Sequence, residues 1–191
     1  MALKLITPAV ALAVSLAEAK LHLRADEAGD DTLITALITS ATEQAEQATG
    51  RAIMLQTWEL TLDAFPEALQ LTRVPAASIT SLKYTDDTGV VRTLDGSLYA
   101  LDNADDYGHA YVVPAYAASW PDTRDQINAV ALRYVAGYAD ATAVPESIKA
   151  WIKLMVGAMY ESREAETVGS GSAIKLGFAD RLLDRYKVWT L

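Results

Sequence analysis

The chain has 191 residues, 51 % of them hydrophobic and 21 % charged, which predicts a folded protein with one sizeable domain or two small ones that share a core. It contains no cysteine, which excludes disulfides and thiolate chemistry. Its formal charge of −9 argues against tight wrapping of nucleic acid, because that requires clustered lysine and arginine. DNA sliding past the surface is compatible with this charge.

The N-terminal residues allow two interpretations. Lys4, the apolar run 9–14 and the small-residue stretch 17–19 resemble a secretory signal with a cleavage site. Alternatively, Ser15 and Glu18 have the spacing of a helix capping box, in which each side chain bonds the backbone of the other. We favour the helix, because the positive region is a single lysine and Pro8 interrupts the apolar run. No stretch of the sequence is long enough to span a membrane.

The first third of the chain is predicted to be helical. A short helix begins after Ser15 and extends to about Arg24, and a longer one begins near Asp30 or Asp31 and ends at Gly50, which suits a left-handed C-cap. Apolar residues recur at three- and four-residue spacing in the longer helix, which predicts one packing face. This face comprises Leu33, Ile34, Leu37, Ile38, Ala41, Ala45 and Ala48.

The middle of the chain is predicted to be β structure. Residues 53–62 are rich in β-branched and large apolar side chains, and segments 79–84 and 90–94 flank the turn sequence Asp86-Asp87-Thr88-Gly89, which predicts a hairpin. Residues 128–134 alternate Val130, Leu132 and Tyr134 with smaller or polar side chains, as in a half-buried strand. The whole segment 53–140 is acidic, with a net charge of −7.

The last third of the chain returns to helix. Pro145 suits the first position of a helix whose apolar stripe runs from Ile148 to Tyr160 at helical spacing. The stretch 169–172 is a Gly/Ser break, and an amphipathic segment follows at 178–186. The predicted fold class is therefore α+β. A helical bundle is formed by N- and C-terminal helices (1–52 and 141–191), with a small antiparallel β module inserted between them (53–140).

Residues with catalytic or metal-binding chemistry are sparse. Neither His22 nor His109 has the partner spacing of a zinc site or a catalytic triad, and no nucleotide-binding or hydrolase motif is present. The acidic loop 102–106 lacks the glycine and closing glutamate of a calcium loop, although cation binding there stays open. The nearby aromatics form a sugar platform, a partner interface or part of the core: Tyr107, Tyr111, Tyr116 and Trp120.

An ordered series of segments resembles the head–tail connector (adaptor) proteins of tailed phages and gene transfer agents. The series begins with the helix at 15–24 and the sequence Thr49-Gly50-Arg51, and it continues over nearly the whole chain. No single motif is specific, and the resemblance depends on the order of the matches. The further segments are 56–60, 114–116, 119–121, 133–138, 144–145, 148–151, 160–164 and 180–186.

The resemblance implies a structural virion protein without catalysis or cofactor. It implies a ring of roughly a dozen copies at the head–tail junction. The partners would be the portal protein, a tail-side stopper or terminator protein, and double-stranded DNA that passes through the lumen without sequence-specific binding. It implies no membrane partner, and it places the protein in the host cytoplasm before assembly.

C-terminal segments of such proteins tend to reach the portal, so by analogy the segment 178–191 is the candidate for portal docking. The ring-interface residues are not predicted. Two alternatives remain open, namely a secreted carbohydrate-binding module or hydrolase, and another head-completion protein such as a tail terminator or stopper. The candidate docking residues are Phe178, Arg181, Leu182, Arg185, Tyr186 and Trp189.

Overall fold

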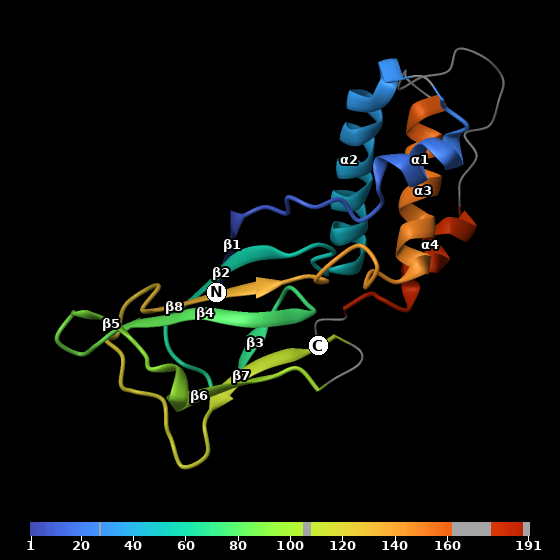
Figure 1. Cartoon of the computed structure of the whole chain (residues 1–191). Helices are drawn as coiled ribbons and strands as arrows, with labels where there is room; N and C mark the ends of the chain where they lie inside the picture. Colours follow the sequence, from blue (N-terminus) through green and yellow to red (C-terminus); the bar gives the residue numbers. More distant parts are fainter. Residues whose placement is uncertain (27, 105–107, 162–176, 189–191) are drawn as a thin grey trace.

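The computed structural model describes residues 1–26, 28–104, 108–161 and 177–188, and it has both helices and antiparallel sheets (Figure 1). The predicted α+β class is confirmed. The helical elements are α1 (Leu16–Leu23), the 3-10 turn η1 (Ala28–Asp30), α2 (Asp31–Thr49), the 3-10 turn η2 (Gly96–Leu98), α3 (Glu146–Glu161) and α4 (Gly177–Asp184). The strands are β1 (Ala2–Thr7), β2 (Gln56–Leu62), β3 (Leu69–Leu71), β4 (Ala76–Thr85), β5 (Val91–Thr93), β6 (Tyr99–Asp102), β7 (Ala110–Pro114) and β8 (Val130–Ala136).

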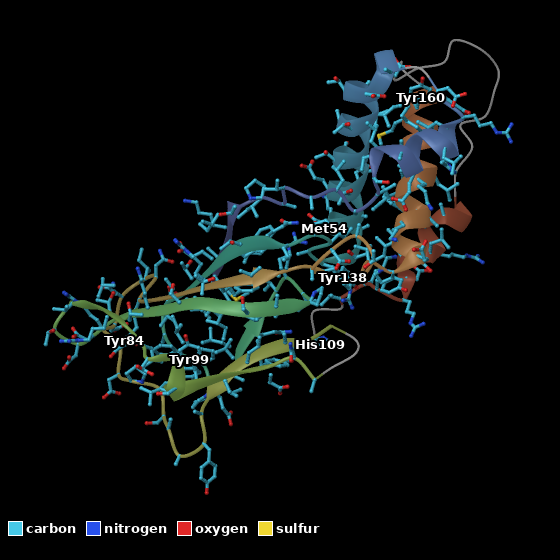
Figure 2. The ribbon with its side chains drawn as sticks, in the orientation of Figure 1. Met54, Tyr84, Tyr99, His109, Tyr138 and Tyr160 are labelled. Atoms are coloured by element: carbon cyan, nitrogen blue, oxygen red, sulfur yellow. The ribbon has the colours of Figure 1, made fainter. Side chains whose placement is uncertain are left out.

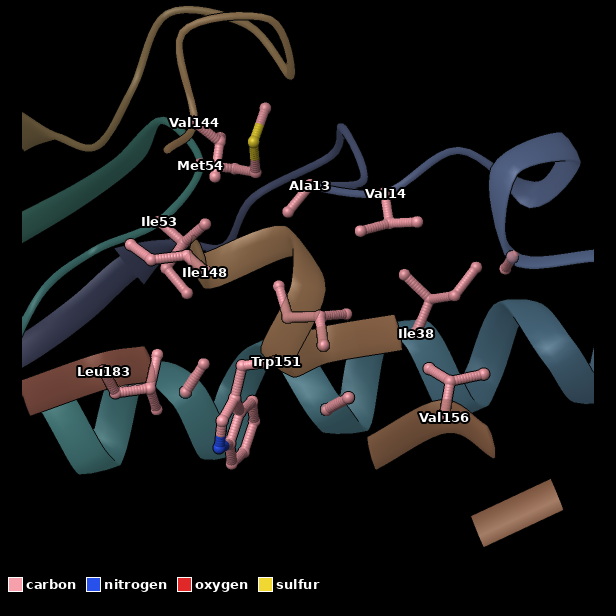
Figure 3. Packing of buried hydrophobic residues seen from close by; sticks show 14 of the residues in the cluster. Ala13, Val14, Ile38, Ile53, Met54, Val144, Ile148, Trp151, Val156 and Leu183 are labelled. Carbon is pink, nitrogen blue, oxygen red and sulfur yellow. The ribbon is translucent and has the colours of Figure 1, made fainter. Parts of the chain in front are cut away.

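The four α-helices pack against one another at one end of the molecule (Figure 1). Buried Ile34, Ile38, Ala41 and Ala45 form the predicted face of α2, and they pack on buried side chains of α3 that include Trp151 (Figure 3). The small alanines let the helix backbones approach closely, and each large buried side chain contributes about 1.5–3 kcal/mol. This cluster is therefore the core of the helical region.

The larger sheet has the strand order β1-β2-β8-β4-β5, and every neighbouring pair is antiparallel. One face is apolar, with Leu60, Leu132 and Leu82 fully buried in one cross-strand row. The other face is polar and carries an ion pair of 2.6 Å between Glu59 and Arg133. The smaller sheet, in the order β3-β7-β6, contributes to the same buried cluster as the apolar face. The β region thus has a core of its own.

The predicted hairpin is present as β4 and β5. The Asp86 carboxylate accepts hydrogen bonds from the backbone N–H groups of Thr88 and Val90, from the Thr88 hydroxyl and from Arg92 Nε. These bonds, the Thr88 hydroxyl first among them, hold the pKa of Asp86 well below its usual value. Gly89 closes the turn at φ +86°, a conformation that glycine adopts without steric cost.

The N-terminal residues have a place in the fold that the sequence did not predict. Residues 2–7 form strand β1, which pairs with β2, and Ala13 and Val14 are fully buried in the helical core. The residues that a signal-peptide interpretation would assign to a leader therefore contribute to the sheet and the core. The division into 1–52, 53–140 and 141–191 stays a prediction. In the part of the chain that the structure describes, no helix has the length and apolarity needed to cross a membrane.

Replacing Ser15 with alanine should destabilise the protein by about 1 kcal/mol. The Ser15 hydroxyl accepts the Glu18 N–H at 3.2 Å, and Glu18 accepts the Ser15 N–H at 2.8 Å, so the predicted capping box is confirmed. Hydrogen bonds from Ser15 lower the pKa of Glu18, so their contribution is present above the usual glutamate pKa and is lost as the pH falls through the lowered one. Urea denaturation of both proteins at pH 7 and at acidic pH measures this difference. An unchanged difference at acidic pH would contradict the linkage.

Candidate assembly interfaces

Helix α4 packs on the bundle through one side and exposes the other. Ala179 and Leu183 are buried against α2 and α3, whereas Arg181 is exposed and so is Arg185 in the turn that follows. Among the predicted docking residues, Leu182 and Tyr186 are half-buried and pack on the same core. The side chain of Phe178 and the whole of Trp189 lie outside the described residues. Among the described docking candidates, Arg181 and Arg185 are therefore the two that are exposed.

The segment after α4 is attached to the C-terminal end of α2. The Val188 N–H donates to the Thr49 carbonyl at 2.8 Å, and Nε of the buried Arg51 donates to the Tyr186 carbonyl at 2.6 Å. Gly50 has the predicted left-handed conformation, and a Cβ at that position would be 3.5 Å from Val188 Cβ. We call residues 185–188 the tail. Hydrogen bonds to Thr49 and Arg51, which are far away in the sequence, hold the backbone of the tail against the end of α2.

Replacing Arg51 with alanine should release the tail and cost about 1.5–3 kcal/mol, because a charged donor to a part-buried carbonyl is lost. Trypsin should then cleave faster after Arg185 and Lys187, which lie within the tail. Limited proteolysis followed by mass spectrometry measures the rate. The matched control is Arg124→Ala, since Arg124 is an exposed arginine in the β region. Equal cleavage rates in the two variants would contradict the attachment.

A second network lies where α2 meets the sheets. Glu46 accepts hydrogen bonds from the Ile53 N–H at 2.7 Å and from the Gln56 amide, and burial raises its pKa. Arg73 donates to the Glu46 carbonyl at 3.1 Å, and its guanidinium is 5.2 Å from the centre of the Trp58 ring. These contacts join the end of α2 to strand β2 and to the segment that precedes β4. Sequence spacing gave no signal for this network.

The candidates for other chemistry do not come together in a site among the residues that the structure describes. The Asp102 carboxylate accepts the Ala104 N–H, Asp105 and Asp106 lie outside the described residues, and the described part of the chain contains no cluster of side chains suited to a metal ion. Trp120 stacks on Phe65 with ring centres 4.7 Å apart, so its ring is used in packing. Tyr116 is fully exposed on its loop, and Tyr107 is not described. Of these aromatic residues, Trp120 therefore contributes to packing in the β region, and Tyr116 is exposed.

Comparison with known proteins gives a match to one family model over part of the chain and a shared fold over all of it. Residues 13–83 match the family model of phage gp6-like head-tail connector proteins. No curated protein matches the sequence. A chain of the virion of a native gene transfer agent (GTA) particle is 23 % identical, with a TM-score of 0.80, and the match covers 100 % of this chain and 97 % of that one.

Two chains from particle necks have the same fold. One, from the neck of an empty GTA particle computed with C6 symmetry, is 24 % identical with a TM-score of 0.79. The other, from the neck of a native GTA particle computed with C12 symmetry, is 22 % identical with a TM-score of 0.69. Both matches cover 100 % of this chain and 97 % of the other. The family model thus covers α1, α2, β2, β3 and most of β4, and the chain shares its fold with these neck chains over its whole length.

Proposed function

We propose that this chain is a structural component of a particle neck, in which copies form a ring between the portal and the tail and DNA passes through the lumen. The observation that carries the proposal is the family match over residues 13–83. The fold shared with neck chains over the full length supports it. A closed ring is the usual way in which identical copies satisfy rotational symmetry. The role requires no catalytic group.

In this proposal the helices form the ring core, and the β region between them is an inserted module. The helical region places Arg181 and Arg185 at its surface, and these two arginines would contact the portal. A stopper or terminator protein would bind on the tail side. The ring would assemble from copies in the host cytoplasm and remain in the virion.

The net charge of −9 suits a channel through which DNA moves. A wall rich in lysine and arginine would bind phosphates and slow transit, whereas an acidic wall repels them. We therefore expect the lumen of the ring to be acidic. An assembled ring whose lumen is lined by lysine and arginine would contradict it.

Coexpression with the portal protein of the same particle tests the proposed role. The product is separated by size exclusion and viewed by negative-stain microscopy, with the portal alone and the chain alone as controls. A second ring stacked on the portal, present only when both proteins are expressed, is the expected result. A chain that elutes as a monomer and leaves the portal unchanged would refute the role.

A further inference from the structure

The five-stranded sheet ends in two free edges, because β1 and β5 each pair with one strand only among the described residues. Both edges are accessible. All three residues of β5 are exposed, with Val91 at 67 %, and Leu5 of β1 is 40 % exposed. A bulge lies at the Thr7 end of β1, whereas Ala2 to Leu5 keep a regular register with β2. Free edges of this kind are templates for pairing with another chain.

The two edges run in the same direction. Each of the four joins in the sheet is antiparallel, so the first and the fifth strand are parallel to each other. A ring of identical copies repeats one head-to-tail contact between two different patches. We propose that β5 of one copy pairs in parallel with β1 of the next, so that the sheets continue from subunit to subunit around the ring. This inference rests on the proposed function, and it identifies the contact between neighbouring copies in the ring.

The register of the sheet defines which residues would meet. One cross-strand row contains Ala2, Thr61, Ala131, Lys83 and Thr93, so these residues lie on one face of the sheet. This is the polar face, since the next row on that side carries the Glu59–Arg133 ion pair.

Full overlap of β5 with β1 requires a stagger between copies. Val91 would lie beside Ala2 of the next copy, and Thr93 beside Lys4. That pairing shifts the neighbour by two residues along the strand, about 7 Å. A constant stagger of this kind inclines the strands to the axis, as in closed barrels.

A groove beside β1 supplies specificity for the neighbour. It has a volume of about 210 Å³ and lies between β1, the loop that follows it, α2 and β2. Its walls are mainly apolar, and its lining includes the acidic residues Glu43 and Glu46. Trp58 also lines the groove, and its Nε1 is buried without a hydrogen-bond partner in the described chain. The lining residues are Leu5, Pro8, Ala9, Val10, Ala11, Leu12, Thr39, Thr42, Glu43, Glu46, Gln56 and Trp58.

The occupant of this surface is a second copy, and charge complementarity supports that choice. Arg92 is the central residue of β5, and its row partner Tyr84 places it on the apolar face, the face of Leu5 and Trp58. In the proposed pairing, Arg92, whose Nε donates to Asp86 of its own copy, therefore lies on the side of the sheet that contains the groove of the next copy, with Glu43 and Glu46 in its lining. Backbone hydrogen bonds between the strands would provide affinity, and the groove would select the partner.

Engineered cysteines test the contact, because the chain has none of its own. The double variant Lys4→Cys/Thr93→Cys replaces two exposed side chains on the same face. Neighbouring strands are about 4.8 Å apart, a spacing that permits a disulfide. The ring is assembled on the portal, oxidised, and separated on a denaturing gel without reductant. The matched control is Leu5→Cys/Thr93→Cys, in which the two cysteines are on opposite faces.

The expected result is a ladder of covalent multimers from Lys4→Cys/Thr93→Cys that reductant removes, and monomers from the control and from each single variant. Rings that form on the portal but give no ladder would overturn the edge contact and leave the proposed function standing. A ladder of equal strength from the control would overturn the parallel register and the face assignment. Failure of the wild-type chain to form a ring would overturn both proposals.

Discussion

Replacing Gly137 with alanine should destabilise the protein by more than about 4 kcal/mol. A Cβ at this position would lie 2.2 Å from the Met54 carbonyl oxygen and 2.7 Å from the Leu55 nitrogen, which are backbone atoms that cannot rotate away. The backbone of Gly137 also has φ +119°, a conformation that alanine rarely adopts. Two independent costs therefore add at one residue.

The location of Gly137 explains why the structure cannot relax around the added atom. The Gly137 N–H donates to the Pro75 carbonyl at 2.8 Å, and the Tyr138 N–H donates to the Ile53 carbonyl at 3.0 Å. The chain thus leaves β8 between two other backbone segments. Met54 and Tyr138 lie at the end of the sheet nearest the helices (Figure 2). Moving the backbone here would displace the sheet relative to the helices.

Thermal denaturation measures this effect. For a chain of this size, 4 kcal/mol corresponds to a fall in Tm of about 8–16 °C, and soluble yield should fall with it. The matched control is Gly29→Ala, since a Cβ at Gly29 has no atom within 4 Å and its φ is not positive. A Gly137→Ala protein that melts within two or three degrees of the wild type, as the control should, would show that the close contact does not constrain the fold.

The features that the sequence predicted well depend on residues close together in the chain. The capping box at Ser15 needs a spacing of three, and the hairpin turn at Asp86–Gly89 is formed by bonds within six residues. The face of α2 was predicted except at its two ends: Leu33 and Ala48 are exposed, and Thr49 is buried instead of Ala48. Thr49 can be buried because its hydroxyl donates to the Ala45 carbonyl at 2.7 Å, which satisfies its polar group.

The features that the sequence did not predict depend on distant partners. Arg51 and Tyr186 are 135 residues apart, and nothing in the sequence around either residue identifies the other. Strand β1 is short, and its apolar residues acquire an orientation only when β2 pairs with it. Gly137 gives no indication of the Met54 backbone beside it. The docking residues were predicted by resemblance alone, and for four of them the structure adds burial, which separates the two exposed arginines from Leu182 and Tyr186.

Reversing the charge of both exposed arginines, as Arg181→Glu/Arg185→Glu, should weaken portal binding at least tenfold and leave Tm nearly unchanged. Both side chains are exposed, so their replacement removes no packing. Each copy loses two positive charges and gains two negative ones, and the change is repeated in every copy of the ring. Tenfold weaker binding corresponds to a loss of about 1.4 kcal/mol in binding free energy. A change of four charge units per copy at one interface is sufficient for a loss of this size. Copurification with the portal at increasing salt measures the loss.

Two further variants separate docking from folding. Leu183→Ala changes the buried side of the same helix and should lower stability by about 2–5 kcal/mol, which distinguishes loss of the fold from loss of the contact. Arg24→Glu/Arg124→Glu makes the same change in net charge at two exposed arginines on other elements, so a non-specific charge effect would appear there as well. If the α4 double variant still copurifies with the portal like the wild type, the portal contact lies elsewhere. If both double variants lose binding equally, the portal responds to overall charge, and α4 has no special part in docking.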